Sequence, residues 1–226
     1  MSNIRQAFQN GKAFIPFITC GDPDLESTKR NVRAAVAAGA DLVELGIPFS
    51  DPTAEGPVIQ AANLRALSGG VTTDAVFQMV AELREELTTP FVFMTYANVV
   101  FSYGIEHFAA RAAEVGIDGI ILPDVPFEEK EEFAPAFRAA GIDFISMIAP
   151  TSMARIREIA AAAEGFLYVV SSLGVTGVRR EINTDLSGML ASVRQANPSL
   201  PAAIGFGIST PAQAQRMAAV ADGVIV

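Results

Sequence analysis

The sequence predicts an α/β fold of the (β/α)8 TIM-barrel class. Short apolar segments recur along the 226 residues, and helical segments separate them. The apolar segments show no alternation with polar residues, which is typical of parallel strands buried on both faces. The chain is close to the roughly 250 residues of one such barrel. We therefore expect one barrel domain spanning residues 1–226.

We expect eight strands, at residues 14–20, 41–47, 91–96, 119–125, 144–149, 166–171, 202–208 and 223–226. A similar short motif precedes several of these strands, and we call it the helix-to-strand joint. Its copies are Gly39-Ala-Asp41, Gly116-Ile-Asp118, Gly141-Ile-Asp143 and a looser Asp222-Gly223. Such a glycine can end a helix in the left-handed conformation. The repeated joint favours a barrel over a two-layer α+β fold. An open doubly wound sheet is the competing architecture, but no G-x-G-x-x-G follows the first predicted strand.

The sequence ends on its eighth predicted strand, at Val226. A complete barrel continues through an eighth loop and a helix that covers strands eight and one. We therefore expect the C-terminal helix and the phosphate-binding loop eight to lie outside residues 1–226. Either further residues follow, or the C-terminus is unusual, and in the second case substrate binding would be weak.

Composition excludes some classes of function. The net charge of −9 and the pI of about 4.6 argue against a broad cationic surface for nucleic acid. Small anions remain possible ligands, because backbone N–H groups can hold a phosphate. No apolar run reaches the roughly 18 residues of a membrane helix, and the first residues lack an apolar signal core. With a single cysteine, Cys20, these features predict a cytoplasmic protein.

Glu44 is a carboxylate in the predicted strand 41–47, where it stands between Val43 and Leu45. Burying a charged group without a partner costs several kcal/mol or forces it to take up a proton. A core ion pair, or a position facing the helices, would account for it structurally. Its place near the carboxyl end of the strand favours a site acid or base with a raised pKa.

Asp51 and Glu55 follow Glu44 in a loop rich in proline and glycine. Asp51 could simply start a turn before Pro52, and Glu55 could be a solvated loop residue. Three acids within reach of one pocket would nevertheless supply proton donor and acceptor roles.

Two later loops carry glycines and hydroxyl groups, at 171–180 and 205–211. The first could fold over a ligand or be only a flexible connection. In the second, glycines permit close backbone approach, and Ser209 or Thr210 can cap a helix whose first turn includes Pro211. Loops seven and eight of such barrels recurrently bind phosphate.

Lysine and histidine are too scarce for two other chemistries. Schiff-base cleavage needs a lysine inside the barrel, but Lys12, Lys29 and Lys130 lie outside the predicted strands. A metal-dependent aldolase would use several histidines, and the sequence has only His107, so we expect no metal site. Carboxylate acid–base catalysis remains, with Tyr96 or Tyr168 as possible assistants at strand ends.

Six segments, in order along nearly the whole chain, resemble the tryptophan synthase alpha subunit family. They are Phe14-Ile-Pro-Phe-Ile-Thr-Cys-Gly-Asp-Pro23, Glu44-Leu-Gly-Ile-Pro-Phe-Ser-Asp-Pro52, Tyr96-Ala-Asn98, Leu122-Pro-Asp-Val-Pro126, Gly174-Val-Thr-Gly177 and Gly205-Phe-Gly-Ile-Ser209. The resemblance implies a barrel that cleaves indole-3-glycerol phosphate reversibly, by a retro-aldol reaction, to indole and glyceraldehyde 3-phosphate. It also implies no cofactor on this subunit, and a pyridoxal-phosphate beta subunit that receives indole through a tunnel in an α2β2 tetramer.

The resemblance also implies roles for individual residues. Glu44 matches the catalytic glutamate that protonates indole C3, and Glu55 falls where the family usually has a catalytic aspartate near the indole N–H. The extra methylene of Glu55 moves its carboxylate by about 1.5 Å. Asp51 matches an aspartate tied to communication with the beta subunit. Other matching positions lie in the indole pocket, the lid or the phosphate cradle: Phe17, Met94, Tyr96, Tyr168, Thr176, Gly177, Phe206 and Gly207.

Two alternatives accompany this prediction. The chain could be a free-standing lyase that releases indole without a partner. It could also be an allosteric partner of a beta subunit, with its own chemistry impaired by the chain end at Val226 and by glutamate at position 55.

Overall fold

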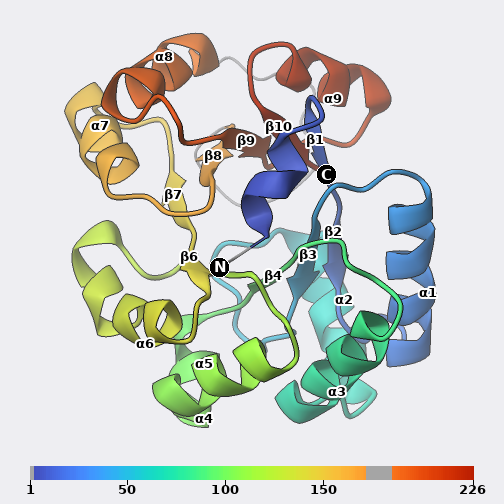
Figure 1. Ribbon diagram of the computed structural model, residues 1–226. Helices are drawn as coiled ribbons and strands as arrows, with labels where there is room; N and C mark the ends of the chain where they lie inside the picture. The colour runs from blue at the N-terminus through green and yellow to red at the C-terminus, as the bar shows by residue number, and fades with distance from the viewer. Residues whose placement is uncertain (1–2, 172–184) are drawn as a thin grey trace.

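A ring of helices surrounds a central set of strands in the computed structural model (Figure 1). The structure describes residues 3–171 and 185–226. Within these residues, no helix is both long and apolar enough to cross a bilayer.

The strands of the described chain all pair in parallel with their neighbours. They are β1 (Ala13–Ile15), β2 (Phe17–Thr19), β3 (Val43–Gly46), β4 (Phe91–Met94), β5 (Gly119–Ile121), β6 (Asp143–Phe144), β7 (Ser146–Ile148), β8 (Leu167–Val170), β9 (Ala202–Gly205) and β10 (Gly223–Ile225). These strands coincide with the eight predicted positions, although most are shorter than expected.

Two predicted strands are each divided by a one-residue break, at Pro16 and at Ile145. As a result, β1 pairs with β10 while β2 pairs with β3, and β6 pairs with β5 while β7 pairs with β8. The hydrogen-bonded orders β1-β10-β9-β8-β7 and β2-β3-β4-β5-β6 therefore join through the two divided strands. The predicted eight-stranded barrel is confirmed. The break at Pro16 follows from chemistry, because proline has no N–H to give to a sheet.

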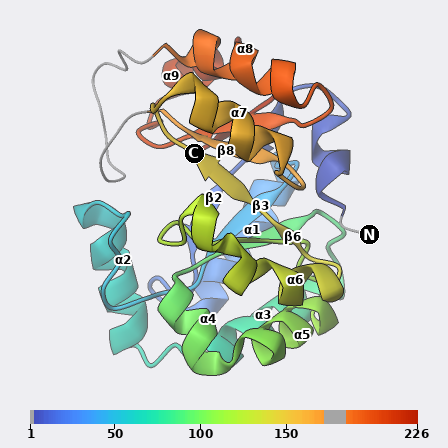
Figure 2. The same ribbon diagram turned by 90° about the vertical axis from the view of Figure 1, so that its left-hand side faces the viewer.

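The helices lie outside the strands. They are α1 (Leu25–Ala37), α2 (Pro57–Ser68), α3 (Thr73–Arg84), α4 (Ala97–Tyr103), α5 (Ile105–Glu114), α6 (Ala134–Ala139), α7 (Met153–Ala161), α8 (Leu186–Ala196) and α9 (Pro211–Ala218), with 3-10 helices η1 (Ile4–Phe8) and η2 (Phe127–Glu132). Helix α9 begins as expected, because the Thr210 side chain accepts a hydrogen bond from the N–H of Gln213. Seen from the side, η1 lies near the end of the barrel where the strands begin, and α2 lies at the opposite end (Figures 1 and 2).

The repeated helix-to-strand joint has a common structure. Gly39, Gly116 and Gly141 take positive φ angles of 98°, 82° and 78°, as a helix-ending glycine should. The aspartates that follow Gly39 and Gly116, together with Asp222 of the looser motif, bind residues at the start of other strands. Asp41 Oδ2 accepts from the N–H of Phe14 at 2.9 Å, Asp118 Oδ2 from Phe91 at 3.0 Å, and Asp222 Oδ2 from Ala202 at 3.0 Å. The joint therefore links the starting ends of the strands to one another.

Side chains of β3 alternate between the two faces of the barrel wall. Val43 and Leu45 belong to the apolar layer beneath the helices, whereas Leu42 belongs to the cluster that fills the barrel interior. Glu44 therefore points into the barrel, above a floor that includes Ile15, Leu42 and Ile121.

Candidate active site

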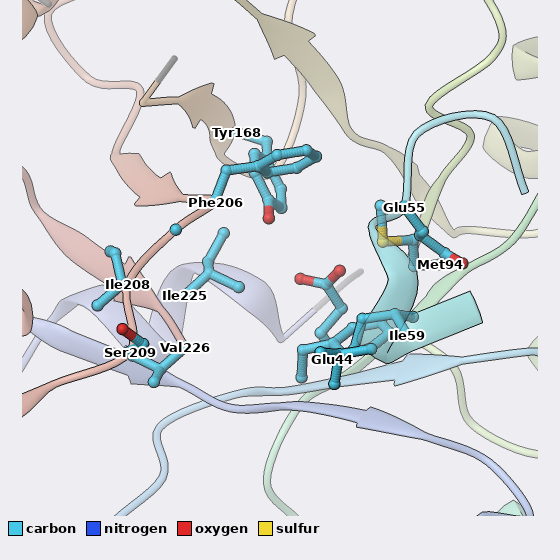
Figure 3. A pocket seen from close by; sticks show the side chains of 13 residues that line it. Glu44, Glu55, Ile59, Met94, Tyr168, Phe206, Ile208, Ser209, Ile225 and Val226 are labelled. Atoms are coloured by element: carbon cyan, nitrogen blue, oxygen red, sulfur yellow. The ribbon is translucent and has the colours of Figure 1, made fainter. Parts of the chain in front are cut away.

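A cavity of about 250 Å³ opens at the carboxyl ends of the strands, where the active sites of barrel enzymes lie. Figure 3 shows the Glu44 carboxyl group projecting into the middle of this cavity, with Glu55 to one side and Tyr168 and Phe206 above. The wall is mostly apolar, and its lining residues are Phe17, Glu44, Glu55, Val58, Ile59, Met94, Tyr168, Phe206, Gly207, Ile208, Ser209, Ile225 and Val226.

Glu44 is fully buried, and neither carboxyl oxygen has a hydrogen-bond partner in the described structure. Burial, and secondarily the negative charge of Glu55, raise the pKa of Glu44 to about 8. The group is therefore mostly protonated at neutral pH and can donate a proton. A buried polar group without a partner is unusual and indicates a functional role here, because its proton faces an open cavity.

Glu55 is also buried, with 6% of its surface exposed, but it has hydrogen-bond partners. Asn63 Nδ2 donates to Glu55 Oε2 at 2.6 Å. Burial raises the pKa of Glu55, while hydrogen bonds from Asn63 and Tyr96 lower it. The two cavity carboxyl groups therefore differ in environment, which is the arrangement that separates an acid from a base.

Tyr168 lies next to Glu44 and is buried. Burial, together with the charge of Glu44, raises the pKa of Tyr168 well above its ordinary value, so its hydroxyl keeps its proton. Its ring packs edge-on against Phe206, with centroids 6.0 Å apart. With Phe17 and Met94 these rings give the cavity walls suited to a flat aromatic ligand.

The segment after β9 forms the opposite wall. Phe206 and Gly207 both have φ of 73°, and Phe206 is the non-glycine residue that adopts a positive φ in the described chain. Ser171 Oγ donates to the Phe206 carbonyl at 2.5 Å, which supports this conformation. Such a turn, just before the N-terminus of α9, is suited to binding an anion through backbone N–H groups.

Two predicted site residues lie outside the cavity wall. Asp51 is exposed, accepts a hydrogen bond from Ser50 Oγ at 2.5 Å, and does not line the cavity, so the expectation of three acids at one pocket is wrong. The loop turns its side chain to solvent. Tyr96 lies behind Glu55, where its hydroxyl accepts from the N–H of Ala54 at 3.1 Å. Thr176 and Gly177 fall outside the described residues.

Sequence reasoning missed several lining residues. Val58 and Ile59 reach the cavity from the first turn of α2, and Ile208 and Ile225 from the opposite side. Asn63 was also missed, although its side chain binds a predicted site residue. The described residues contain no group of three or more His, Cys, Asp or Glu side chains placed to hold a metal ion.

The chain is similar to proteins of one family. The family described as tryptophan synthase alpha chain matches residues 2–226. A tryptophan synthase alpha chain from Lacticaseibacillus casei is 51% identical over all of this chain and 85% of its own length. The crystal structure of the alpha chain from Legionella pneumophila superposes with a TM-score of 0.88 at 38% identity, covering 100% of this chain and 85% of that one.

A structure described as the tryptophan synthase α2β2 complex from Pyrococcus furiosus also matches. Its TM-score is 0.85 at 37% identity, and the match covers 96% of this chain and 87% of that one. The family match spans residues 2–226, and the Lacticaseibacillus casei alpha chain is 51% identical over all of this chain. This chain belongs to the tryptophan synthase alpha chain family.

Proposed function

We propose that this chain is the alpha subunit of tryptophan synthase and cleaves indole-3-glycerol phosphate to indole and glyceraldehyde 3-phosphate in tryptophan biosynthesis. The observation that carries the proposal is Glu44: a protonated carboxyl group without a hydrogen-bond partner, aimed into an apolar cavity beside a second carboxylate. Residues 1–226 would act as one catalytic domain.

The apolar and anionic parts of the substrate match different parts of the cavity wall. Its indole ring matches the apolar wall that includes Phe17, Met94 and Tyr168. Its phosphate would lie toward Gly207, whose backbone precedes α9. The two ends of the cavity thus match the two ends of the substrate.

The reaction needs two proton transfers, one to C3 of the indole ring and one from a hydroxyl group of the substrate side chain. Glu44 donates its proton to C3 of the indole ring as the bond between C3 and the side chain breaks. The hydroxyl group on the departing carbon loses its proton and becomes the aldehyde of glyceraldehyde 3-phosphate. That proton returns to Glu44, so the carboxyl group regains its starting state. Glu55, as a carboxylate, accepts a hydrogen bond from the indole N–H and stabilises the charge that develops on the ring.

A beta subunit is the expected partner, in an α2β2 assembly like that described for the Pyrococcus furiosus complex. Helices α2 and α4 follow β3 and β4, so both begin at the mouth of the cavity. Val58 on α2 and Phe101 on α4 are large apolar side chains with 68% and 70% of their surface exposed. In the proposed complex these two side chains would supply apolar contact area to the beta subunit, and the exposed loop residue Asp51 lies at the same mouth.

The expected cofactor distribution places pyridoxal phosphate on the beta subunit and none on this chain. The expected location is the cytoplasm, which the single, buried and unpaired cysteine supports.

Indole release should be measured with and without a beta subunit. We expect the purified chain to release indole from indole-3-glycerol phosphate and a tryptophan synthase beta subunit to accelerate the release strongly. An equal rate without the beta subunit would identify a free-standing lyase. Activation of a beta subunit by a chain that releases no indole would identify an impaired allosteric partner.

Gly205 tests the placement of Tyr168. A Cβ atom at position 205 would lie 2.3 Å from the Tyr168 hydroxyl oxygen and 2.6 Å from Cζ. Gly205→Ala must therefore push the tyrosine ring toward the substrate space. Overpacking of this kind costs about 1–3 kcal/mol, so we expect a lower melting temperature and a KM raised several-fold.

The matched control is Gly205→Ala combined with Tyr168→Leu, which removes the clashing atoms. The double variant should recover the melting temperature of the single Tyr168→Leu variant. Equal destabilisation in both backgrounds would contradict the proposed contact.

A further inference from the structure

We propose that Asn63 is a positioning residue for Glu55, whose side-chain amide holds the Glu55 carboxylate at the cavity wall in its ionised form. The inference rests on the proposed function, because it concerns how one of the two cavity carboxylates is prepared for the reaction.

The contact itself is short and protected from solvent. Asn63 Nδ2 lies 2.6 Å from Glu55 Oε2, and both residues are buried, with 4% and 6% of their surfaces exposed. Hydrogen bonds from a neutral donor to a carboxylate are shorter and stronger than those between neutral groups. Water cannot easily replace the amide at such a site, so the carboxylate depends on Asn63 for this bond.

Helix α2 binds Glu55 at two points. Gln60 Nε2 donates to the Glu55 main-chain carbonyl at 2.7 Å, and Asn63, three residues later on the same face, donates to the side chain. The helix is tied to the loop after β2, because Arg65 donates to both carboxyl oxygens of Asp22 at 2.7 Å. Asn63 therefore stands on an anchored element, as a positioning group must.

The charges around Glu55 explain why a donor is needed. Glu44 on β3 faces the same cavity, and like charges disfavour ionisation. Tyr96 at the end of β4 gives a hydrogen bond to Glu55, and Asp124 acts electrostatically on that tyrosine. Burial raises the pKa of Glu55, and among the opposing contributions the hydrogen bond from Asn63 is the largest. Without Asn63, the charged form of Glu55 would lose this hydrogen bond, and burial would raise the pKa of Glu55 further.

The test compares Asn63→Leu and Asn63→Asp with the wild type, in complex with a beta subunit. Leucine removes the donor, and aspartate keeps the shape but places a second carboxyl group against Glu55, so that the two must share a proton. We expect kcat to fall about tenfold with KM within about twofold, because a bond that matters in the transition state changes kcat rather than ground-state binding. We also expect the acid limb of the kcat/KM profile to move up by about one pH unit, since the charged form of Glu55 loses a hydrogen bond.

The alkaline limb should stay in place, because it follows deprotonation of Glu44, which titrates when Glu55 is already charged. Gln60→Leu is the matched control, since Gln60 contacts the backbone of Glu55 and not its carboxylate. It should keep the wild-type acid limb. A uniform loss of activity in the Asn63 variants with an unshifted acid limb would show a merely structural role and overturn the inference.

A titration that needs no substrate separates this inference from the proposed function. With ¹³C-labelled glutamate in a Glu44→Gln background, NMR should show the Glu55 carboxyl titrating at higher pH when Asn63→Leu is added. An unchanged titration would overturn the role of Asn63 even if the wild type cleaves the substrate. A shifted titration, together with a wild-type chain that cleaves no indole-3-glycerol phosphate, would leave Asn63 in its role and refute the proposed function.

Discussion

Glu44→Gln is expected to reduce cleavage of indole-3-glycerol phosphate by about a thousandfold, within the range for loss of a positioned general acid. Glutamine has nearly the same shape and is neutral, as the Glu44 acid is at pH 7. It cannot give up a proton to indole C3, so the carbon–carbon bond has no acid to assist its cleavage. The loss should appear in kcat, measured as indole release, with KM nearly unchanged.

An exposed glutamate provides the control for Glu44→Gln. Glu106→Gln removes a carboxyl group from the exposed first turn of α5 and should leave the rate at the wild-type value. Indole release by Glu44→Gln at the wild-type rate would refute the assignment of Glu44 as the proton donor.

Glu44 should also make the folded protein less stable as the pH rises. Its pKa is about 8 in the folded state and 4.5 as an ordinary glutamate, so between these values the folded state holds a proton that the unfolded state has lost. Stability from this group is therefore complete below pH 4.5 and falls until pH 8. At about 1.4 kcal/mol per pH unit, the loss reaches about 3 kcal/mol at pH 7 and about 5 kcal/mol above pH 8.

Glu44→Gln removes this loss, because the amide does not titrate. Urea unfolding of both proteins at pH 5, 7 and 8.5 should give free energies of unfolding that differ little at pH 5. The variant should be more stable by about 3 kcal/mol at pH 7. Parallel curves across the three pH values would mean that the Glu44 carboxyl group is already ionised in the folded protein.

Most of the fold was predictable because it depends on local patterns. Apolar segments without polar alternation located the strands, and the positive φ of Gly39, Gly116 and Gly141 agrees with the predicted helix-ending role. The breaks at Pro16 and Ile145 were not predicted. The break at Pro16 could have been predicted, because proline has no N–H to donate to a sheet. The break at Ile145 depends on how neighbouring strands pair around the ring, which no local pattern reveals.

Some residues of the site were likewise predictable from local sequence, and others were not. Glu44 was predictable because a charged residue is unusual inside an apolar strand, and Glu55 was predictable because it lies in the loop that follows. The exposed position of Asp51 depends on the path of that loop through space. Asn63 lies eight residues beyond Glu55 on α2, and no motif in the sequence pairs its side chain with that carboxylate. The contact between Asn63 and Glu55 became visible only in the structure.

The aspartates at the helix-to-strand joints have a consequence for how this protein can change over time. Asp41, Asp118 and Asp222 link strand to strand at one end of the barrel, while Glu44 and Glu55 work at the other. Substitutions around the mouth can therefore alter the ligand or the partner while these strand-to-strand links stay in place. Loss of one of these aspartates should instead destabilise the whole barrel and leave the chemistry of surviving molecules intact. Evolution can adjust each end of this barrel separately.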